Sequence, residues 1–97
     1  MADFLFHPEA QDDYITALAW YQTRSARTAT RFEAEVQRVL DLIDDNPSSF
    51  PHYDDEHRFA LLRRFPYCIV YQEQPARVYV IAVAHGSRSP GYWKGRK

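Results

Sequence analysis

The apolar residues between Phe32 and Ile43 recur with the period of an α-helix. They stand at i, i+4, i+7, i+8 and i+11, which places all of them on one helical face. Ser25 is positioned to cap the start of this helix, and Asn46-Pro47 ends it because proline disfavours helical backbone in the residue before it. The pattern predicts an amphipathic helix whose buried face is formed by Phe32, Val36, Val39, Leu40 and Ile43.

A first helix is predicted upstream, beginning at His7-Pro8-Glu9. Proline is favoured at the first helical position, and the acidic residues that follow lie near the positive end of the helix dipole. Because only Thr23-Arg24-Ser25 separates the two helices, they should form an antiparallel hairpin. The apolar stripe of the first helix consists of Tyr14, Ala17, Leu18 and Tyr21, while Ile15 and Trp20 lie off it and suggest a second contact.

Extended segments account for most of the remaining chain. Phe4–Phe6 precedes the helices, and Arg58–Arg64, Tyr67–Glu73 and Val78–His85 follow them. The breaks between the last three are short, which favours antiparallel hairpins over parallel crossovers. The final strand should be central, because both of its faces are apolar: one is formed by Tyr79, Ile81 and Val83, the other by Val80, Ala82 and Ala84.

These elements predict an α+β fold of order β-α-α-β-β-β, with the helical hairpin packed on one face of a curved antiparallel sheet. The opposite face would then be free for a partner. With 97 residues the chain has room for one core, so we expect a single domain over residues 1–97. Its basic tail, residues 94–97, should be mobile.

The sequence points to a cytoplasmic protein. Met1-Ala2-Asp3 lacks the positive and apolar regions of a signal peptide. No apolar stretch approaches the roughly 20 residues that span a bilayer, so no membrane contact is expected. The single Cys68 excludes an internal disulfide and fits a reducing compartment.

Charge is divided unequally along the chain. The part through His57 holds twelve acidic and four basic residues, whereas the part from Arg58 onward holds one acidic and eight basic residues. The net charge of −1 therefore conceals two opposed surfaces. The basic and aromatic C-terminal part suggests a contact with phosphate or with an acidic protein segment.

Several short sequence motifs, spread over nearly the whole chain, occur together in an order that is more specific than any one of them. The most specific is the last, which carries His85, Arg88, Pro90 and Tyr92-Trp93. In this combination the chain resembles the RelE/ParE family of bacterial toxins from type II toxin–antitoxin systems, from about Phe4 to Trp93. The other matching stretches are Phe6-His7-Pro8-Glu9-Ala10, Trp20-Tyr21, Arg31-Phe32, Asn46-Pro47, Phe50-Pro51, Arg63-Arg64-Phe65-Pro66-Tyr67, Ile69-Val70-Tyr71 and Ala82-Val83-Ala84.

The resemblance implies a plasmid-stabilisation type of toxin that inhibits growth and is held inactive by a cognate antitoxin, in a toxin–antitoxin hetero-oligomer. RelE-like members enter the ribosome and cut messenger RNA. ParE-like members bind DNA gyrase and trap it on DNA without catalysing a reaction. The fold does not choose between these targets, since function resides in the site. No cofactor is implied.

The positions that carry basic side chains in the RNA-cutting branch correspond here to Phe59, Leu61, Cys68 and Gly86. Cleavage by 2′-hydroxyl attack needs a proton acceptor and positive charge beside the phosphate, and these residues supply neither. The resemblance therefore favours action by binding. The alternatives are an endoribonuclease that uses a shifted set of residues, and an inactive relative that only binds its antitoxin. The shifted set is Arg63, His85, Arg88 and Tyr92.

The residues assigned to target or antitoxin binding all belong to the basic part: Arg58, Arg63, Arg64, His85, Arg88 and Tyr92. A structural role is equally well supported for two of these residues. His85 could bond within a loop, and Arg88 could fasten the tail onto the acidic helices. If the strand continues through Arg63 and Arg64, they point to opposite faces. Tyr71 and Trp93 are expected to be packing residues.

Other chemistries find little support. His7, His52 and His57 lack metal-ligand spacing, and carboxylates in a row, as in Asp54-Asp55-Glu56, rarely converge on one ion. The serines lack an acid–base pair at recognisable spacing. All three glycines lie after residue 85, so there is no glycine-rich phosphate loop. Neither a metal nor a cofactor is expected.

Overall fold

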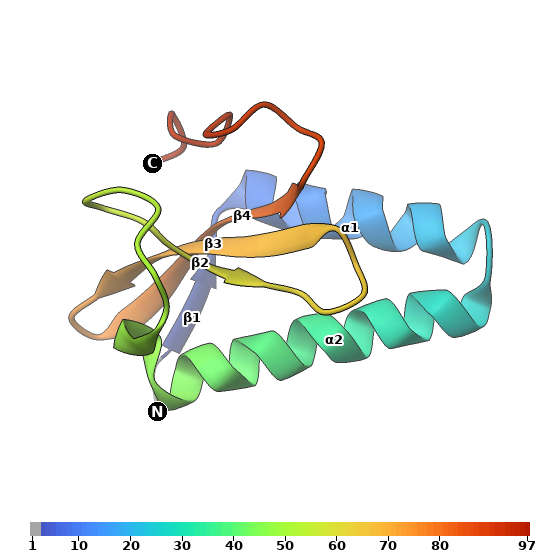
Figure 1. Cartoon of the computed structure of the whole chain (residues 1–97), viewed down its shortest axis with the longest axis horizontal. Coiled ribbons are helices and arrows are strands. Elements are labelled where there is room, and N and C mark those ends of the chain that lie inside the picture. The colour runs from blue at the N-terminus through green and yellow to red at the C-terminus, as the bar shows by residue number, and fades with distance from the viewer. Residues whose placement is uncertain (1–2) are drawn as a thin grey trace.

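Two helices and a four-stranded sheet form the two layers of this protein (Figure 1). The structure is a computed structural model that describes residues 3–97, so Met1 and Ala2 of the N-terminal stretch considered above lie outside the described residues. The expected α+β order is confirmed. In chain order the elements are β1 (Asp3–Phe6), α1 (Pro8–Gln22), α2 (Ala26–Asp45), the 3₁₀ helix η1 (Pro47–Ser49), β2 (Arg58–Leu61), β3 (Tyr67–Gln74) and β4 (Arg77–His85).

Both helices begin at the residues that the sequence indicates. Nδ1 of His7 accepts a hydrogen bond from the Glu9 backbone N–H at 3.0 Å, at the start of α1. Oγ of Ser25 accepts one from Thr28 at 3.2 Å and caps α2. α2 ends at Asp45, as the Asn46-Pro47 pair predicts. None of the helices in residues 3–97 is long and apolar enough to cross a membrane.

The sheet is mixed, with strand order β1-β4-β3-β2. β3 pairs antiparallel with both β2 and β4, as the short connections predict. β1 lies parallel to β4, with Phe4 opposite Val78, so the sheet as a whole is not antiparallel. This parallel pair is possible because the helical hairpin and two further strands intervene between β1 and β4.

A β-bulge shifts the alternation of side chains in β4. Tyr71 of β3 pairs with Val80 and Val70 pairs with Ala82, which leaves Ile81 as the additional residue. The expected face of Tyr79, Ile81 and Val83 is therefore right for Tyr79 and Ile81, which share a cluster, and wrong for Val83, which pairs with Ile69 of the other cluster. Ile81 packs in the same cluster as its neighbour Ala82, because the extra residue moves the later side chains out of phase.

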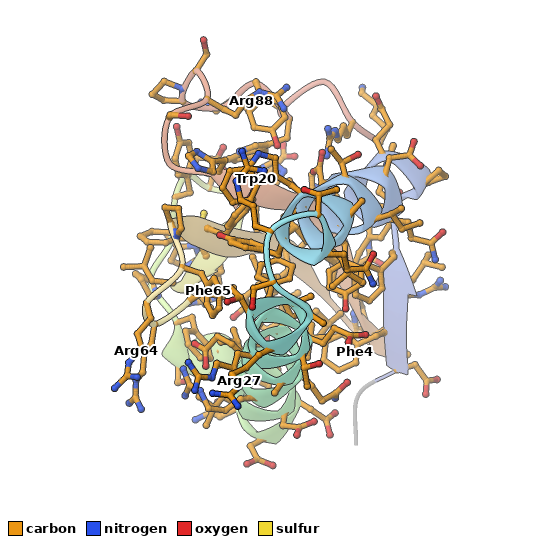
Figure 2. All side chains as sticks on the ribbon, turned by 90° about the vertical axis from the view of Figure 1, so that its right-hand side faces the viewer. Phe4, Trp20, Arg27, Arg64, Phe65 and Arg88 are labelled. Carbon is orange, nitrogen blue, oxygen red and sulfur yellow. The ribbon has the colours of Figure 1, made fainter. Side chains whose placement is uncertain are left out.

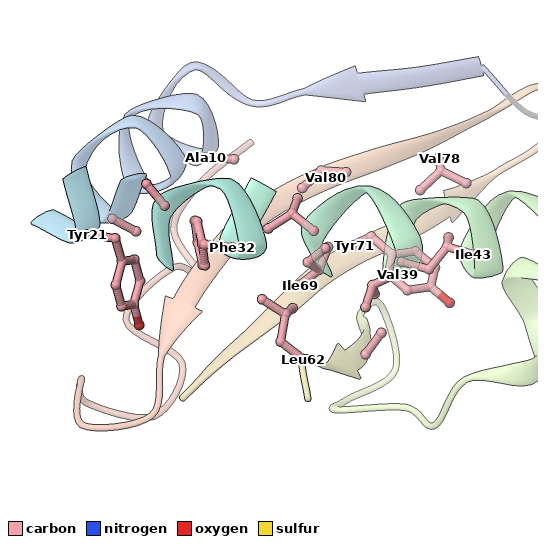
Figure 3. Packing of buried hydrophobic residues seen from close by; sticks show 14 residues of the cluster. Ala10, Tyr21, Phe32, Val39, Ile43, Leu62, Ile69, Tyr71, Val78 and Val80 are labelled. Carbon is pink, nitrogen blue, oxygen red and sulfur yellow. The ribbon is translucent and has the colours of Figure 1, made fainter. Parts of the chain in front are cut away.

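Buried residues fill both sides of the sheet, so β4 is central as expected. The cluster between the sheet and the helices contains Phe32, Ile43 and Tyr71, each with 0% exposure (Figure 3). The second cluster lies on the other side and includes Val70, Ile81 and the indole of Trp93. Tyr71 and Trp93 are thus packing residues, as predicted.

β2 is shorter than the sequence suggests. It ends at Leu61 rather than Arg64, and Arg64 has a φ of 65°, in the left-handed region. The backbone N–H of Arg63 donates to Oε2 of Glu35 on α2 instead of continuing the strand. The expectation that Arg63 and Arg64 alternate across a strand is therefore wrong, because both lie in the turn before β3.

Candidate functional site

Two cross-strand rows of apolar side chains cover the sheet face that the helices leave free. Phe59, Val70 and Ala82 form one row across β2, β3 and β4. The second row consists of Leu61, Cys68 and Ala84. Opposite residues of paired strands share a face, so the six side chains form one continuous surface. Three of the positions compared with the RNA-cutting branch, Phe59, Leu61 and Cys68, thus lie together on this surface.

The C-terminal segment, residues 86–97, returns over this surface and encloses a pocket. Trp93 is its anchor, with 3% exposure, and its ring contacts those of His57 and Tyr53 edge-on at 4.6 and 4.9 Å. The cavity measures about 430 Å³. Its walls are mostly apolar and include Phe59, Leu61, Cys68, Val70, Pro90 and Trp93. Leu61 keeps 69% of its surface exposed, so the pocket opens toward solvent at β2.

An ion pair between α1 and the end of the chain holds the C-terminal segment in place. Nη1 of Arg96 donates to Oδ2 of Asp13 at 2.7 Å and to the Ile81 carbonyl at 2.9 Å. The same carboxylate accepts hydrogen bonds from the Val83 N–H at 3.1 Å and from the Tyr92 hydroxyl at 3.4 Å. The tail was expected to be mobile, but Arg96 fastens it to the helix and the sheet.

Sequence reasoning did not identify Asp13 and Arg96 as partners. Asp13 was assigned to the helix dipole, and Arg96 to a solvated tail. The two residues are 83 positions apart, and no local pattern links them. The predicted fastening of the tail to the acidic helices does exist, but Arg96 provides it. Arg88 instead places its guanidinium 3.9 Å from the centre of the Tyr92 ring.

The shifted nuclease set is only partly assembled. His85, Arg88 and Tyr92 line one small cavity of about 170 Å³ together with Asp12 and Asp13. Arg63 is not among its lining residues and lies near Glu35 of α2. The structure therefore joins three of the four residues and adds two carboxylates, of which Asp13 accepts a hydrogen bond from the Tyr92 hydroxyl.

Burial affects the pKa of two groups in this region, the Tyr92 phenol and the Cys68 thiol. Burial raises the pKa of the Tyr92 phenol, and the nearby Asp13 carboxylate raises it further. Burial also raises the pKa of the Cys68 thiol. Nδ1 of His85 accepts a hydrogen bond from the Ser87 N–H at 3.0 Å. His85 thus stabilises the loop that follows β4, and its ring packs edge-on against that of Tyr67, with ring centres 4.9 Å apart.

The arginines assigned to binding differ in how far they are engaged. Arg58 donates to the Phe50 carbonyl at 2.6 Å and lies 3.5 Å from the Glu73 carboxylate, so its guanidinium is already bonded within the protein. Arg63, Arg64 and Arg88 are exposed. Within residues 3–97, no group of three or more His, Cys, Asp or Glu side chains is arranged to hold a metal ion.

Comparison with known proteins matches the chain to a family and to solved structures. The family model described as "ParE toxin of type II toxin-antitoxin system, parDE" matches residues 4–90. A solved structure described as "Chromosomal ParDE TA system from P. aeruginosa" matches with a TM-score of 0.74 and 11% sequence identity, over 88% of this chain and 96% of that chain. At this identity the structural match shows the shared fold. No curated protein matches the chain.

Proposed function

The chain belongs to the family of ParE toxins of type II toxin–antitoxin systems, and on this premise we propose that it inhibits growth by binding DNA gyrase and is neutralised by a cognate antitoxin. The activity would be one of binding, with no bond made or broken by the toxin itself. The site would be the surface formed by the two apolar rows and the C-terminal segment.

The apolar character of this surface carries the proposal. An enzyme that cuts RNA needs charged and proton-accepting groups where the substrate phosphate lies. Here Phe59, Leu61 and Cys68 occupy adjoining positions and line a pocket of about 430 Å³. Such a pocket matches the buried apolar centre of a protein interface, where a side chain of the partner is anchored.

The endoribonuclease alternative is favoured by one observation, the shared cavity of His85, Arg88 and Tyr92. Two features oppose it. The raised pKa of Tyr92 disfavours the phenolate that would act as a base. Asp13, beside the Tyr92 hydroxyl, places negative charge where the cleavage transition state also gathers it. A third reading, a relative that only binds its antitoxin, predicts no growth effect at all.

Two assays after induction without antitoxin separate the targets. We expect inhibition of gyrase supercoiling and trapped gyrase–DNA complexes, with messenger RNA left intact. New RNA 5′ ends that disappear in Arg88→Ala would support the nuclease instead. Harmless high-level expression of the folded protein would contradict both forms of toxin.

Leu61→Glu tests the proposed surface directly. Leu61 is 69% exposed, so the change places a charge at the mouth of the pocket with little effect on folding. We expect gyrase inhibition to fall at least about tenfold, as for an interface residue worth more than about 1.4 kcal/mol. Leu42→Glu is the matched control, since Leu42 is an exposed leucine (44%) on α2, away from the pocket. Equal losses in both variants would argue against this surface.

A further inference from the structure

Three segments of the chain contain arginines and no acidic residue. They are residues 14–32, 61–68 and 85–93, which hold Arg24, Arg27, Arg31, Arg63, Arg64 and Arg88. The first of these segments lies in the part of the chain whose overall charge is strongly negative. The acidic residues of that part stand before residue 14 and after residue 32, so its turn region is locally basic.

The fold brings these segments to one end of the molecule. Phe65, in the β2–β3 turn, packs edge-on against Tyr21 of α1 and Phe32 of α2, with ring centres 5.2 and 5.3 Å apart. Trp20 shares a small cavity with Pro66 and His85, which connects the end of α1 to the last loop. Figure 2 looks along the long axis onto the α1–α2 turn and shows Arg27, Arg64 and Arg88 around Trp20 and Phe65 in projection, while Figure 1 shows that the loop after β4 starts nearer the middle of the molecule. We refer to the six arginines together as the arginine end.

Every arginine of this end is exposed, and none forms an ion pair within residues 3–97. Of the other four arginines, Arg38, Arg58 and Arg96 each pair with a carboxylate, whereas Arg77 is exposed like the six. Arg31 lies one helical turn after Arg27. Glu35, one turn further along α2, pairs with Arg38 instead of Arg31, with Nε of Arg38 2.7 Å from Oε1 of Glu35. Arg63 lies near the Glu35 carboxylate, and Arg88 lines a small cavity with Asp12 and Asp13. The six arginines outnumber these three carboxylates, so they repel one another, and an external anion would relieve this repulsion.

We infer that the arginine end binds the phosphate backbone of double-stranded DNA. The guanidinium is planar and presents paired N–H donors that match phosphate oxygens. The basic residues of this end are all arginines, and they come from three separate segments rather than from one flexible arm. The end faces along the long axis of a molecule that measures 39 × 28 × 21 Å, so its cross-section is comparable with the width of a duplex.

The aromatic residues at this end favour a duplex over a single strand. Proteins that bind single strands stack bases on exposed aromatic faces. Here Tyr21 and Phe65 are packed against other rings, and the Arg24 guanidinium covers one face of Trp20 at 3.7 Å. An acidic protein segment would also satisfy the charge, but its apolar anchor would find only the half-exposed Trp20 among these arginines. The large apolar pocket lies on the open face of the sheet, where Arg88 is the one member of the arginine end that lines it.

This inference rests on the proposed function for its biological meaning, since a toxin that traps gyrase on DNA would approach both molecules. It predicts an affinity for DNA that is present without gyrase. The net charge of −1 excludes a general attraction of the whole protein to polyanions, so any such affinity must come from a local surface.

The test is fluorescence anisotropy of a labelled duplex of about 24 base pairs with the purified toxin, over a range of salt concentrations. The variant Arg27→Gln, Arg64→Gln, Arg88→Gln removes three charges from the arginine end. The control Arg77→Gln, Lys94→Gln, Lys97→Gln removes three exposed charges elsewhere and reaches the same net charge. Circular dichroism and thermal melting establish that all three proteins are folded.

We expect the wild type to bind with a Kd of about 1–100 µM, weakening steeply with salt. The arginine variant should bind at least about tenfold more weakly, and its salt slope should be smaller by roughly 2–3. The control should stay within about twofold of wild type. Undetectable wild-type binding at low salt, or equal losses in both variants, would overturn the inference.

A loss of antitoxin affinity in the arginine variant with DNA affinity unchanged would assign this end to an acidic protein instead, and would also overturn it. The assay contains no gyrase, so its result is independent of the proposed target. If gyrase is not inhibited but DNA binding follows the expected pattern, the proposed target fails and the inference stands.

Discussion

Tyr71 places a polar atom in the middle of the helix-side core. Its side chain has 0% exposure, and its hydroxyl donates a hydrogen bond of 2.6 Å to the Pro47 carbonyl in η1. This bond joins the centre of the sheet to the turn that ends α2. Burial raises the pKa of the Tyr71 phenol to about 12, and the nearby Glu73 carboxylate adds to the shift against the opposing effect of Arg58.

Tyr71→Phe should lower the free energy of unfolding by about 1 kcal/mol at neutral pH, because the Pro47 carbonyl loses its partner. The raised pKa means that the folded state holds the phenol proton more tightly than the unfolded state does. Its contribution to stability is therefore complete below about pH 10 and is lost as the pH rises through about 12. Urea unfolding at pH 7 and at pH 11 measures both effects.

Tyr71→Phe should therefore lose less unfolding free energy than wild type between pH 7 and pH 11. Tyr53→Phe is the control, since the Tyr53 side chain is 39% exposed. If Tyr71→Phe and wild type lose stability equally between pH 7 and pH 11, the buried phenol is not the responsible group.

At the scale of elements, the C-terminal segment is the part whose position depends on contacts distant in sequence. It has no helix or strand of its own, and it is held by Trp93 in the second cluster and by the pair of Arg96 with Asp13. Both side chains of that pair are 11% exposed. The pocket of the candidate site exists only while this segment is in place.

Asp13→Asn should loosen the segment, because it removes the charge that binds Arg96. Loss of hydrogen bonds to a charged group costs about 1.5–3 kcal/mol. We expect trypsin to cleave after Lys94 and Arg96 several times faster than in wild type, and gyrase inhibition to weaken with it. Asp12→Asn is the control, since Asp12 is the exposed neighbour of Asp13 on the same helix. Unchanged cleavage in Asp13→Asn would show that Trp93 alone holds the segment.

At the scale of the whole molecule, basic and acidic residues are separated along the long axis more clearly than between the two halves of the sequence. Arg24, Arg27 and Arg31 lie at or beside the turn between α1 and α2, whereas Asp41 and Asp45 lie toward the other end of α2 (Figure 1). The turn of the helical hairpin is therefore locally basic, although the part of the chain through His57 is acidic overall. A partner with complementary charge would be oriented before contact.

Association with an acidic antitoxin should consequently be fast and sensitive to salt. We expect the association rate constant to fall at least about tenfold between 50 and 500 mM NaCl, while the dissociation rate constant changes much less. Stopped-flow mixing of the separately refolded proteins measures both. An association rate that does not vary with salt would refute an electrostatic role in docking.

Much of this fold is predictable from local sequence. The helix stripe that begins at Phe32, the cap at Ser25 and the stop at Asn46-Pro47 are short-range features, and the structure confirms each of them. The bulge at Ile81 and the early end of β2 are not predictable from local sequence, because both depend on how a strand pairs with its neighbour. For the candidate site, the sequence identified the apolar positions Phe59, Leu61 and Cys68 but not the pocket over them.

The sequence by itself therefore determined which segments become helices and strands, which family the chain resembles and that its proposed RNA-cutting positions are apolar. The helices and strands follow from residue spacing over short stretches, whereas the family and the RNA-cutting positions follow from the resemblance of the whole chain. The tertiary structure alone decided that Arg96 meets Asp13, that Trp93 closes a pocket over the sheet, and that arginines from three segments share one end. Such arrangements join residues far apart in sequence, and only the packing of helices on the sheet brings them together.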